Sequence, residues 1–229
     1  MAALQKHGFF KRIVPGNRHL QFLIRRKTHR ETIDYWRSPQ DTANAAKSYL
    51  AGTEKSQMLV NVFRADEIPV EGSVLELGCN VGRNLNLLLS NGYRNLSGVE
   101  VSSEALGLMR IHYADLAGTV KVYDSTIEAQ IKRFRDAEFD VVFTMAVLMH
   151  IHRDSDFVFG EIARITKSTL IVIEDEEGLA VKNFTRNYKK IFERLGFTQT
   201  RHEDCRGRHG FGDKGMHLRV FKKGFIGGA

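Results

Sequence analysis

Short apolar runs alternate with helix-like segments along most of the chain. Strand-like runs cover residues 74–77, 96–101, 119–123, 139–144 and 168–175. Helical segments are expected at residues 84–91, 103–114, 127–134, 156–165 and 181–195. Short buried strands separated by helices of this length predict an α/β fold, with a parallel sheet and helices on both faces.

The two ends of this pattern differ from its middle. Residues 196–205 and 216–223 are strand-like runs joined by the glycine-rich segment RGRHGFGDKG. They predict a terminal hairpin and therefore an antiparallel edge strand. Near the other end, the segment from Gln40 has helical composition, with Pro39 and Asp41 marking a start and Gly52 dividing it.

The stretch VLELGCNVGRNL, residues 74–85, runs from the first strand through a glycine-containing turn into a helix. Glycines let the backbone approach a ligand closely, and a helix start has free N–H groups, so this is a nucleotide-binding shape. The alternatives are a dinucleotide and a nucleoside without phosphate. The G-x-G-x-x-G spacing that suits a pyrophosphate is absent, which favours the nucleoside.

Five features in register resemble one family. The segments LELGCNVGRNL, LSGVEVSSEAL, VYDSTIE and FDVVFTMAVLMHI, with the terminal strand pair, are similar to the successive motifs of class I S-adenosylmethionine-dependent methyltransferases. The resemblance covers about residues 55–225. It implies a Rossmann-like fold with a seven-stranded, mostly parallel sheet, a C-terminal antiparallel hairpin strand and helices on both faces, and it implies S-adenosylmethionine as cofactor.

The turn after the first strand supplies the first candidate cofactor residues. Glu76 adds negative charge near the cationic methionyl end of such a cofactor, and Gly78 and Gly82 let the backbone lie against it. Asn80 stands where the family pattern E-x-G-x-G-x-G has its middle glycine, and asparagine tolerates left-handed backbone well. The alternatives are a helix-start carboxylate for Glu76 and ordinary turn residues for the glycines.

Further cofactor residues follow the next strands. Glu100 ends the second strand, where a carboxylate can accept both ribose hydroxyls, and Val101 follows it. The resemblance implies that Asp124 accepts the adenine amino group, while the backbone of Ser125 or Thr126 contacts the ring. The alternatives are a solvated strand-end acid for Glu100 and an ordinary turn or N-cap aspartate for Asp124.

The segment TMAVLMHIHRD after the fourth strand bears on the chemistry. By resemblance, Thr144 and Met145 line the methionine and methyl end of the cleft. His150 is the candidate general base for an acceptor hydroxyl, since an unperturbed pKa of about 6.5 suits that task. His152 is a candidate substrate residue near the mouth of the cleft. The alternatives are a structural histidine bonded to backbone at His150 and a solvated one at His152.

Other segments are candidates for selecting the acceptor. Tyr35 and Trp36 precede the first expected helix, where this family often places a lid, although a lone aromatic anchor for that helix is equally expected. Glu174 begins the acidic segment EDEEG at the end of the fifth strand and is a candidate for contact with an acceptor amine or hydroxyl. A solvated turn is the alternative for this segment.

Composition limits the possibilities further. The chain has 229 residues, of which 42% are hydrophobic and 27% charged, as in an ordinary soluble protein with one core. No apolar run suggests a membrane span or a signal peptide, so a cytoplasmic location is expected. Cys79 and Cys205 have no metal-ligand spacing, so no metal site is expected.

The net charge is concentrated at the N-terminus. Residues 1–37 hold nine Lys and Arg against two acids, which equals the formal excess of +7 of the whole chain. We therefore expect a basic arm at 1–37 and a charge-balanced methyltransferase domain at 38–229, with a lid or cap helix at about 38–66.

Together these features predict S-adenosylmethionine-dependent O- or N-methylation of a small-molecule or saccharide-like acceptor. Methylation of RNA is the alternative substrate class, suggested by the basic arm and by RGRHGFGDKG, but the main domain is neutral and shows no nucleic-acid module. A non-catalytic S-adenosylmethionine-binding partner or regulator is the alternative from another class.

Overall fold

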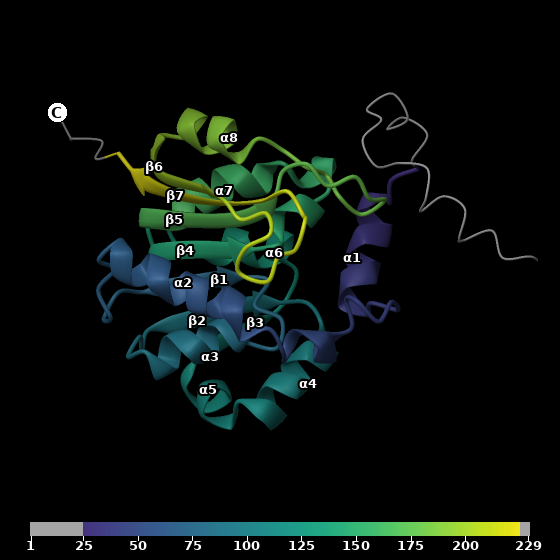
Figure 1. The fold of residues 1–229 in the computed structure, drawn as a ribbon, viewed down its shortest axis with the longest axis horizontal. Helices are drawn as coiled ribbons and strands as arrows, with labels where there is room; N and C mark the ends of the chain where they lie inside the picture. The colour runs from purple at the N-terminus through teal and green to yellow at the C-terminus, as the bar shows by residue number, and fades with distance from the viewer. Residues whose placement is uncertain (1–24, 225–229) are drawn as a thin grey trace, which may run out of the picture.

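Seven strands form one sheet in the order β3-β2-β1-β4-β5-β7-β6 (Figure 1). The computed structural model describes residues 25–224. The strands are β1 (Val74–Leu77), β2 (Leu96–Glu100), β3 (Lys121–Asp124), β4 (Phe139–Met145), β5 (Thr166–Asp175), β6 (Phe197–Asp204) and β7 (Met216–Lys223). Strands β1 to β5 pair in parallel, and β7 runs antiparallel to both β5 and β6. The predicted mostly parallel sheet with a terminal hairpin is confirmed.

Helices pack on both faces of this sheet. The α-helices are α1 (His29–Arg37), α2 (Thr53–Ala65), α3 (Arg83–Ser90), α4 (Ser103–His112), α5 (Ala114–Thr119), α6 (Ile127–Gln130), α7 (Phe157–Ile165) and α8 (Tyr188–Arg194). The 3-10 helices are η3 (Ala46–Tyr49), η4 (Ile131–Arg133), η5 (Leu148–His150) and η6 (Arg153–Ser155). Gly52, with φ of 80°, separates η3 from α2, as the sequence predicted.

Alternate residues of the strands face two separate cores. Val141 and Ile171 pack with α2, α3 and α4 on one face, whereas Val142 and Leu170 pack with α7 and α8 on the other. Because side chains alternate along a strand, a strand that is covered on both faces is apolar at successive positions. This explains why the strand segments read as continuous apolar runs.

Three helical segments differ from the prediction. The segment before α8 is not helical at 181–187, because Asn187 caps α8 and the Phe184 N–H bonds to the Met149 carbonyl (2.6 Å). A separate short helix, α5, precedes β3 in place of a direct connection. Helix α1 forms within the expected arm, where Thr28 and Glu31 make a reciprocal capping box at its start.

The position of the ligand cleft follows from the strand order. The chain leaves β1 in one direction to β2 and β3, and in the other to β4 and β5, so β1 and β4 form the switch point of the sheet. Clefts in such sheets open at the carboxyl ends of these strands. Helix α1 stands beside this edge of the sheet (Figure 1).

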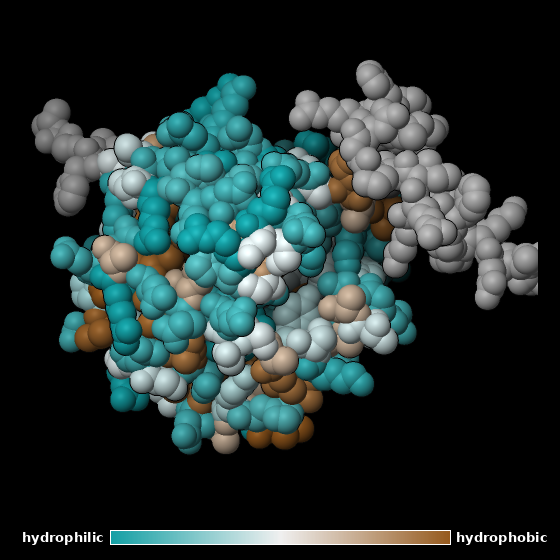
Figure 2. Space-filling view, viewed as in Figure 1, coloured by the Kyte–Doolittle hydropathy of each residue, from teal (hydrophilic) through white to brown (hydrophobic). Residues whose placement is uncertain are grey.

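One face of the molecule is mostly polar (Figure 2). Figure 2 shows one face of the molecule, on which hydrophobic residues form small separate groups within a hydrophilic surface. Between residues 25 and 224, no helix has the length and apolar character needed to cross a membrane.

Candidate active site

The turn after β1 has the backbone that its sequence predicts. Gly78, Asn80 and Gly82 have φ angles of 73°, 48° and 79°. A Cβ atom on Gly78 would lie 2.6 Å from a methyl of Val147, and one on Gly82 would lie 2.6 Å from a methyl of Leu116. Only glycine fits these two positions, because both the conformation and the space exclude a side chain.

Glu76 lines the cleft and has one carboxylate oxygen without a partner. Its Oε1 accepts a hydrogen bond from Asn84 Nδ2 (2.7 Å), whereas Oε2 is buried without a partner. The side chain is 2% exposed and lines the cavity, and this burial raises the pKa of Glu76 to about 8. A buried oxygen without a partner is costly, so the site favours a ligand with a cationic or hydrogen-bond-donating group. The ammonium and sulfonium of S-adenosylmethionine fit this requirement.

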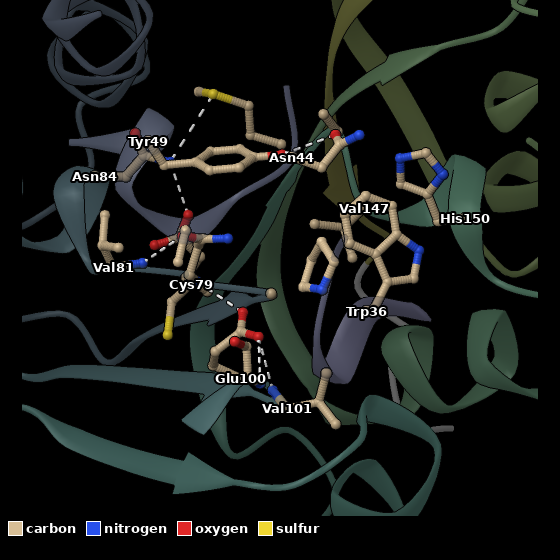
Figure 3. Close-up of a pocket in the computed structure, with 18 of the residues that line it drawn as sticks. Trp36, Asn44, Tyr49, Cys79, Val81, Asn84, Glu100, Val101, Val147 and His150 are labelled. Carbon is tan, nitrogen blue, oxygen red and sulfur yellow. Dashed lines mark hydrogen bonds between the residues drawn. The ribbon is translucent and has the colours of Figure 1, made fainter. Parts of the chain in front are cut away.

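Glu100 binds the backbone around it as well as lining the cavity. Its Oε2 accepts a hydrogen bond from the Asn80 N–H (2.8 Å), and its Oε1 accepts from the N–H groups of Val101 (2.9 Å) and Ser102 (2.8 Å). Burial raises the pKa of Glu100, although these N–H groups oppose the shift. A carboxylate has about four acceptor positions, so this conformation leaves room for one further bond. Figure 3 shows Glu100 and Val101 on the cavity wall.

The loop after β3 lines the part of the cavity where adenine is expected. Ser125 and Thr126 line the cavity, and the Thr126 side chain also caps α6 by accepting from the Ala129 N–H (3.2 Å). Asp124 is exposed, pairs in register with Glu100 and lies outside the cavity wall. Its contact with adenine therefore stays a prediction.

Glu174 holds the loop that follows β4. Its carboxylate accepts hydrogen bonds from Thr144 Oγ1 (2.8 Å) and from the N–H groups of Val147 (3.0 Å) and Met149 (3.1 Å). Both Glu174 and Thr144 are completely buried and lie behind the cavity wall, which Met145 and Val147 form here. Burial raises the pKa of Glu174 to about 7. Glu174 thus has neither of the two surroundings expected for it, since it is neither solvated nor in the cleft.

His150 lies on the cavity wall with one nitrogen already bound. Its Nδ1 is 3.0 Å from the Lys182 carbonyl, which can only accept, so Nδ1 carries the proton and Nε2 is an acceptor. Within residues 25–224, Nε2 has no hydrogen-bond partner. Burial lowers the pKa of His150 to about 3. This corrects the expectation of an ordinary pKa near 6.5, because the ring is neutral over the whole physiological range.

Helix α1 and η3 form a lid over the cavity. Trp36 lies in the wall, and its ring centroid is 4.4 Å from that of His150 (Figure 3). Tyr35 points away from the cavity, and its hydroxyl donates to Asp41 and accepts from Lys182 Nζ (2.9 Å). Tyr35 therefore joins the lid to the segment before α8, whereas the neighbouring Trp36 faces the cleft.

One expectation about this region changes in the structure, and one residue is added to the site. His152 lies outside the cavity wall, accepts from the Asp154 N–H (3.1 Å) and packs on Phe184, so it stabilises η6. Arg83, which the sequence did not single out, donates through Nη1 to the carbonyls of Ala51 (2.7 Å) and Tyr49 (3.2 Å) and thereby holds the lid. The sequence signal that could have identified Arg83 was its position directly after Gly82, at the start of α3.

One cavity of about 470 Å³ contains both ends of the site. Its wall includes Glu76 and Glu100 at the expected cofactor end, His150 beside the lid, and Lys55 and Lys214 from two further segments. Among the residues that the structure describes, no group of three or more His, Cys, Asp or Glu is placed to hold a metal ion.

The comparisons with known proteins agree with this geometry. Residues 75–173 match the family model described as a methyltransferase domain. No curated protein matches the chain. Among solved structures, magnesium protoporphyrin IX methyltransferase from Synechocystis PCC 6803 with bound S-adenosylmethionine is 15% identical, with a TM-score of 0.64 over 92% of this chain and 100% of that chain.

Two further structures share the fold. A methyltransferase from Haloferax volcanii in complex with the Trm112 methyltransferase activator is 16% identical, with a TM-score of 0.64 over 88% of this chain and 100% of that chain. The [4+2]-cyclase SpnF is 16% identical, with a TM-score of 0.60 over 73% of this chain and 80% of that chain. At these identities the likeness establishes the fold, and the presence of a cyclase among these structures shows that this fold does not by itself define the reaction.

Proposed function

We propose that this chain, which belongs to the class I S-adenosylmethionine-dependent methyltransferases, methylates a hydroxyl or amino group of a small-molecule or saccharide-like acceptor. The observation that carries this proposal is the continuity of the cavity. Glu76, which has a carboxylate oxygen without a partner, and His150, with its free Nε2, line one cavity beneath the lid.

The cofactor end needs residues that bind a cation and an adenosine. Bound S-adenosylmethionine supplies a methyl group on a sulfonium sulfur, already activated for transfer. Glu76 Oε2 would accept from its amino group, Glu100 from a ribose hydroxyl, and the loop at Ser125 and Thr126 would contact the adenine ring. Methyl transfer is an in-line displacement, so holding the two reactants in one line contributes much of the rate.

His150 would act on the acceptor. Its Nε2 can accept a hydrogen bond from the acceptor O–H or N–H and so direct the nucleophile toward the methyl group. A neutral imidazole of low pKa is a weak base in the ground state. As the new bond to carbon forms, however, the acceptor proton becomes far more acidic, so Nε2 can take it late in the reaction.

The enclosure supports a small acceptor over a polymer. Helix α1 and η3 cover the cleft, and Thr32, Ile33 and Trp36 of α1 form part of its wall. Covered clefts of roughly 300–1,000 Å³ are typical of small-molecule sites. A polynucleotide needs an open groove along which its backbone can lie, whereas α1 and η3 cover this cleft.

A methyl-transfer screen tests this function. The full chain is incubated with methyl-labelled S-adenosylmethionine and separate pools of small metabolites, saccharides and RNA, and labelled products are identified by mass spectrometry. We expect label in a small product, with about 10²- to 10⁴-fold slower labelling when His150→Ala replaces the wild type. Label in RNA alone, or tight cofactor binding with no labelled product from any pool, would contradict the proposal.

A further inference from the structure

Two lysines line the cavity without a carboxylate partner. Lys55 lies in the first turn of α2, and Lys214 lies in the loop between β6 and β7. The Lys55 ammonium is 5.1 Å from the ring centroid of Phe211, which lines the same cavity. Within residues 25–224, the lysines that form ion pairs are Lys167, Lys182, Lys189 and Lys222. Lys55 and Lys214 therefore present unpaired positive charges to the cleft.

The acids of the cavity wall are engaged elsewhere. Glu76 binds Asn84, Glu100 binds backbone N–H groups, and Glu128 lies 3.7 Å from His29. All three belong to β1, β2 or α6, whereas the lysines belong to α2 and the β6–β7 loop. The three acids are thus already engaged, and the third cation of the wall, Arg83, donates to the carbonyls of Tyr49 and Ala51, which leaves Lys55 and Lys214 as the wall cations without such a partner among the described residues.

The cations also act on one another and on His150. Burial lowers the pKa of Lys55, and repulsion by Arg83 and Lys214 adds to this shift. The charges of Lys182 and Lys214 add to the effect of burial on the pKa of His150, so both ammonium groups are close enough to influence that ring. A bound anion would offset this repulsion, which makes the part of the cleft near His150 suited to negative charge.

We propose that the acceptor carries an anionic group, a carboxylate or a phosphate, which Lys55 and Lys214 bind while the nucleophile of the acceptor lies against His150. This inference rests on the proposed function and gives the chemical class of the acceptor. Ammonium groups form charge-assisted hydrogen bonds to either anion and, being flexible, adapt to its geometry.

The carboxylate of the cofactor is the competing occupant of this cation pair. Helix α3 starts at the same cavity with no side-chain cap, so its first N–H groups are open to that carboxylate. The two lysines are then left for the acceptor. An experiment has to separate these two anions.

Anion binding to the full chain with S-adenosylhomocysteine bound tests the proposal. Trp36 is the only tryptophan and lies in the cavity wall, so its fluorescence reports on this site. Inorganic phosphate and acetate are titrated separately at constant ionic strength. We expect a saturable change with at least one anion, and its identity distinguishes a phosphate from a carboxylate acceptor. Lys55→Met and Lys214→Met should each weaken that binding about tenfold or more.

Lys47→Met is the matched control, because Lys47 is exposed on η3 and lies outside the cavity wall. It should leave anion binding unchanged. No saturable change in the wild type, or unaltered binding in the two lysine variants, would overturn the inference. The binding of S-adenosylhomocysteine is also compared with that of 5′-methylthioadenosine, which lacks the amino-acid part. If the two lysine variants weakened only the binding of S-adenosylhomocysteine, the lysines would hold the cofactor, and the inference would be overturned. Failure of the wild type to bind S-adenosylhomocysteine would count against the proposed function instead.

Discussion

The ring of Trp36 packs on the ring of His150, with centroids 4.4 Å apart and planes inclined by 43°. Trp36 belongs to the lid helix α1, and His150 ends η5 in the loop after β4. The contact therefore connects the element that covers the cleft to the element that carries the candidate catalytic group. It also removes water from His150, which is the main cause of its low pKa.

Truncation of Trp36 should open the lid. Trp36→Ala removes a large aromatic contact that is worth several kcal/mol when buried, so we expect cofactor affinity to fall about tenfold and the pKa of His150 to rise toward its ordinary value. Calorimetry measures the affinity, and NMR titration of the ring protons measures the pKa. Trp36→Phe keeps a ring in place, so its cofactor affinity and the pKa of His150 should lie between those of the wild type and Trp36→Ala. An unchanged pKa in Trp36→Ala would mean that the lid does not desolvate His150.

His150→Ala should lower turnover about 10²- to 10⁴-fold, while cofactor affinity changes less than about threefold. His152→Ala is the control, because His152 caps η6 outside the cavity. The wild type should show no histidine titration of turnover between about pH 6 and 8, since the folded pKa is about 3. Near-normal turnover of His150→Ala would contradict a role as general base, and catalysis would then rest on positioning of the reactants alone.

The same pKa predicts an acid effect on stability. The folded protein keeps His150 neutral, whereas the unfolded chain protonates it near pH 6.5. The resulting stabilisation is full above about pH 6.5 and is lost as the pH falls toward 3. Part of the acid sensitivity of unfolding should therefore disappear in His150→Ala, as measured by denaturant titration at several pH values.

Glu174→Ala should destabilise the fold and misplace the loop after β4. It leaves the N–H groups of Val147 and Met149 without acceptors in a buried place, which costs about 1–3 kcal/mol for each group. Each kcal/mol lowers the melting temperature by roughly 2–4 °C in a protein of this size. Glu177→Ala is the control, since the Glu177 side chain is 56% exposed. A melting temperature equal to that of the control would refute the anchoring role.

These residues show which features of the site could be predicted from the sequence. The turn at Gly78, Asn80 and Gly82 was predictable because its conformation depends on local residue type. The burial of Glu174 was not, because its hydrogen-bond donors come from a segment more than 20 residues away that folding brings to it. The same holds for the pKa of His150, which depends on Trp36 and on the carbonyl of Lys182.

The strand order was likewise within reach, since parallel strands joined by helices leave few topologies. Helix α1 was missed although its signal was local. The spacing Thr28-x-x-Glu31 is a capping box, but the surrounding basic residues made the segment read as an arm. The first 24 residues of that arm lie outside the described residues.

Two truncations separate the arm from the lid. Removing residues 1–24 deletes Lys6, Lys11, Arg12 and Arg18 and keeps α1, so polyanion affinity should fall while S-adenosylmethionine affinity is retained. Removing residues 1–37 also deletes part of the cavity wall and should therefore weaken the binding of the cofactor. Filter binding of RNA at two salt concentrations and calorimetry measure the two effects. Equal cofactor affinity in both truncations would show that α1 plays no part in the site.

The binding of S-adenosylmethionine should release a proton from Glu76. The folded pKa of about 8 keeps this carboxyl largely protonated at pH 7 in the absence of ligand, and a cation at Oε2 favours the ionised form. Affinity should therefore rise between about pH 6 and 8. Calorimetry in buffers of different ionisation enthalpy counts the protons released.

Glu76→Gln is the matched variant, because it keeps an oxygen for Asn84 and cannot ionise. We expect it to lower the affinity for S-adenosylmethionine about tenfold or more and to abolish the proton release. The variant should also lack the loss of folding stability that the wild type shows as the pH rises. In the wild type the stabilisation from protonated Glu76 is full below about pH 4.5 and is lost as the pH rises through 8, whereas the variant has no such loss. If both proteins release the same number of protons, another group is linked to cofactor binding, and Glu76 Oε2 does not face the cation.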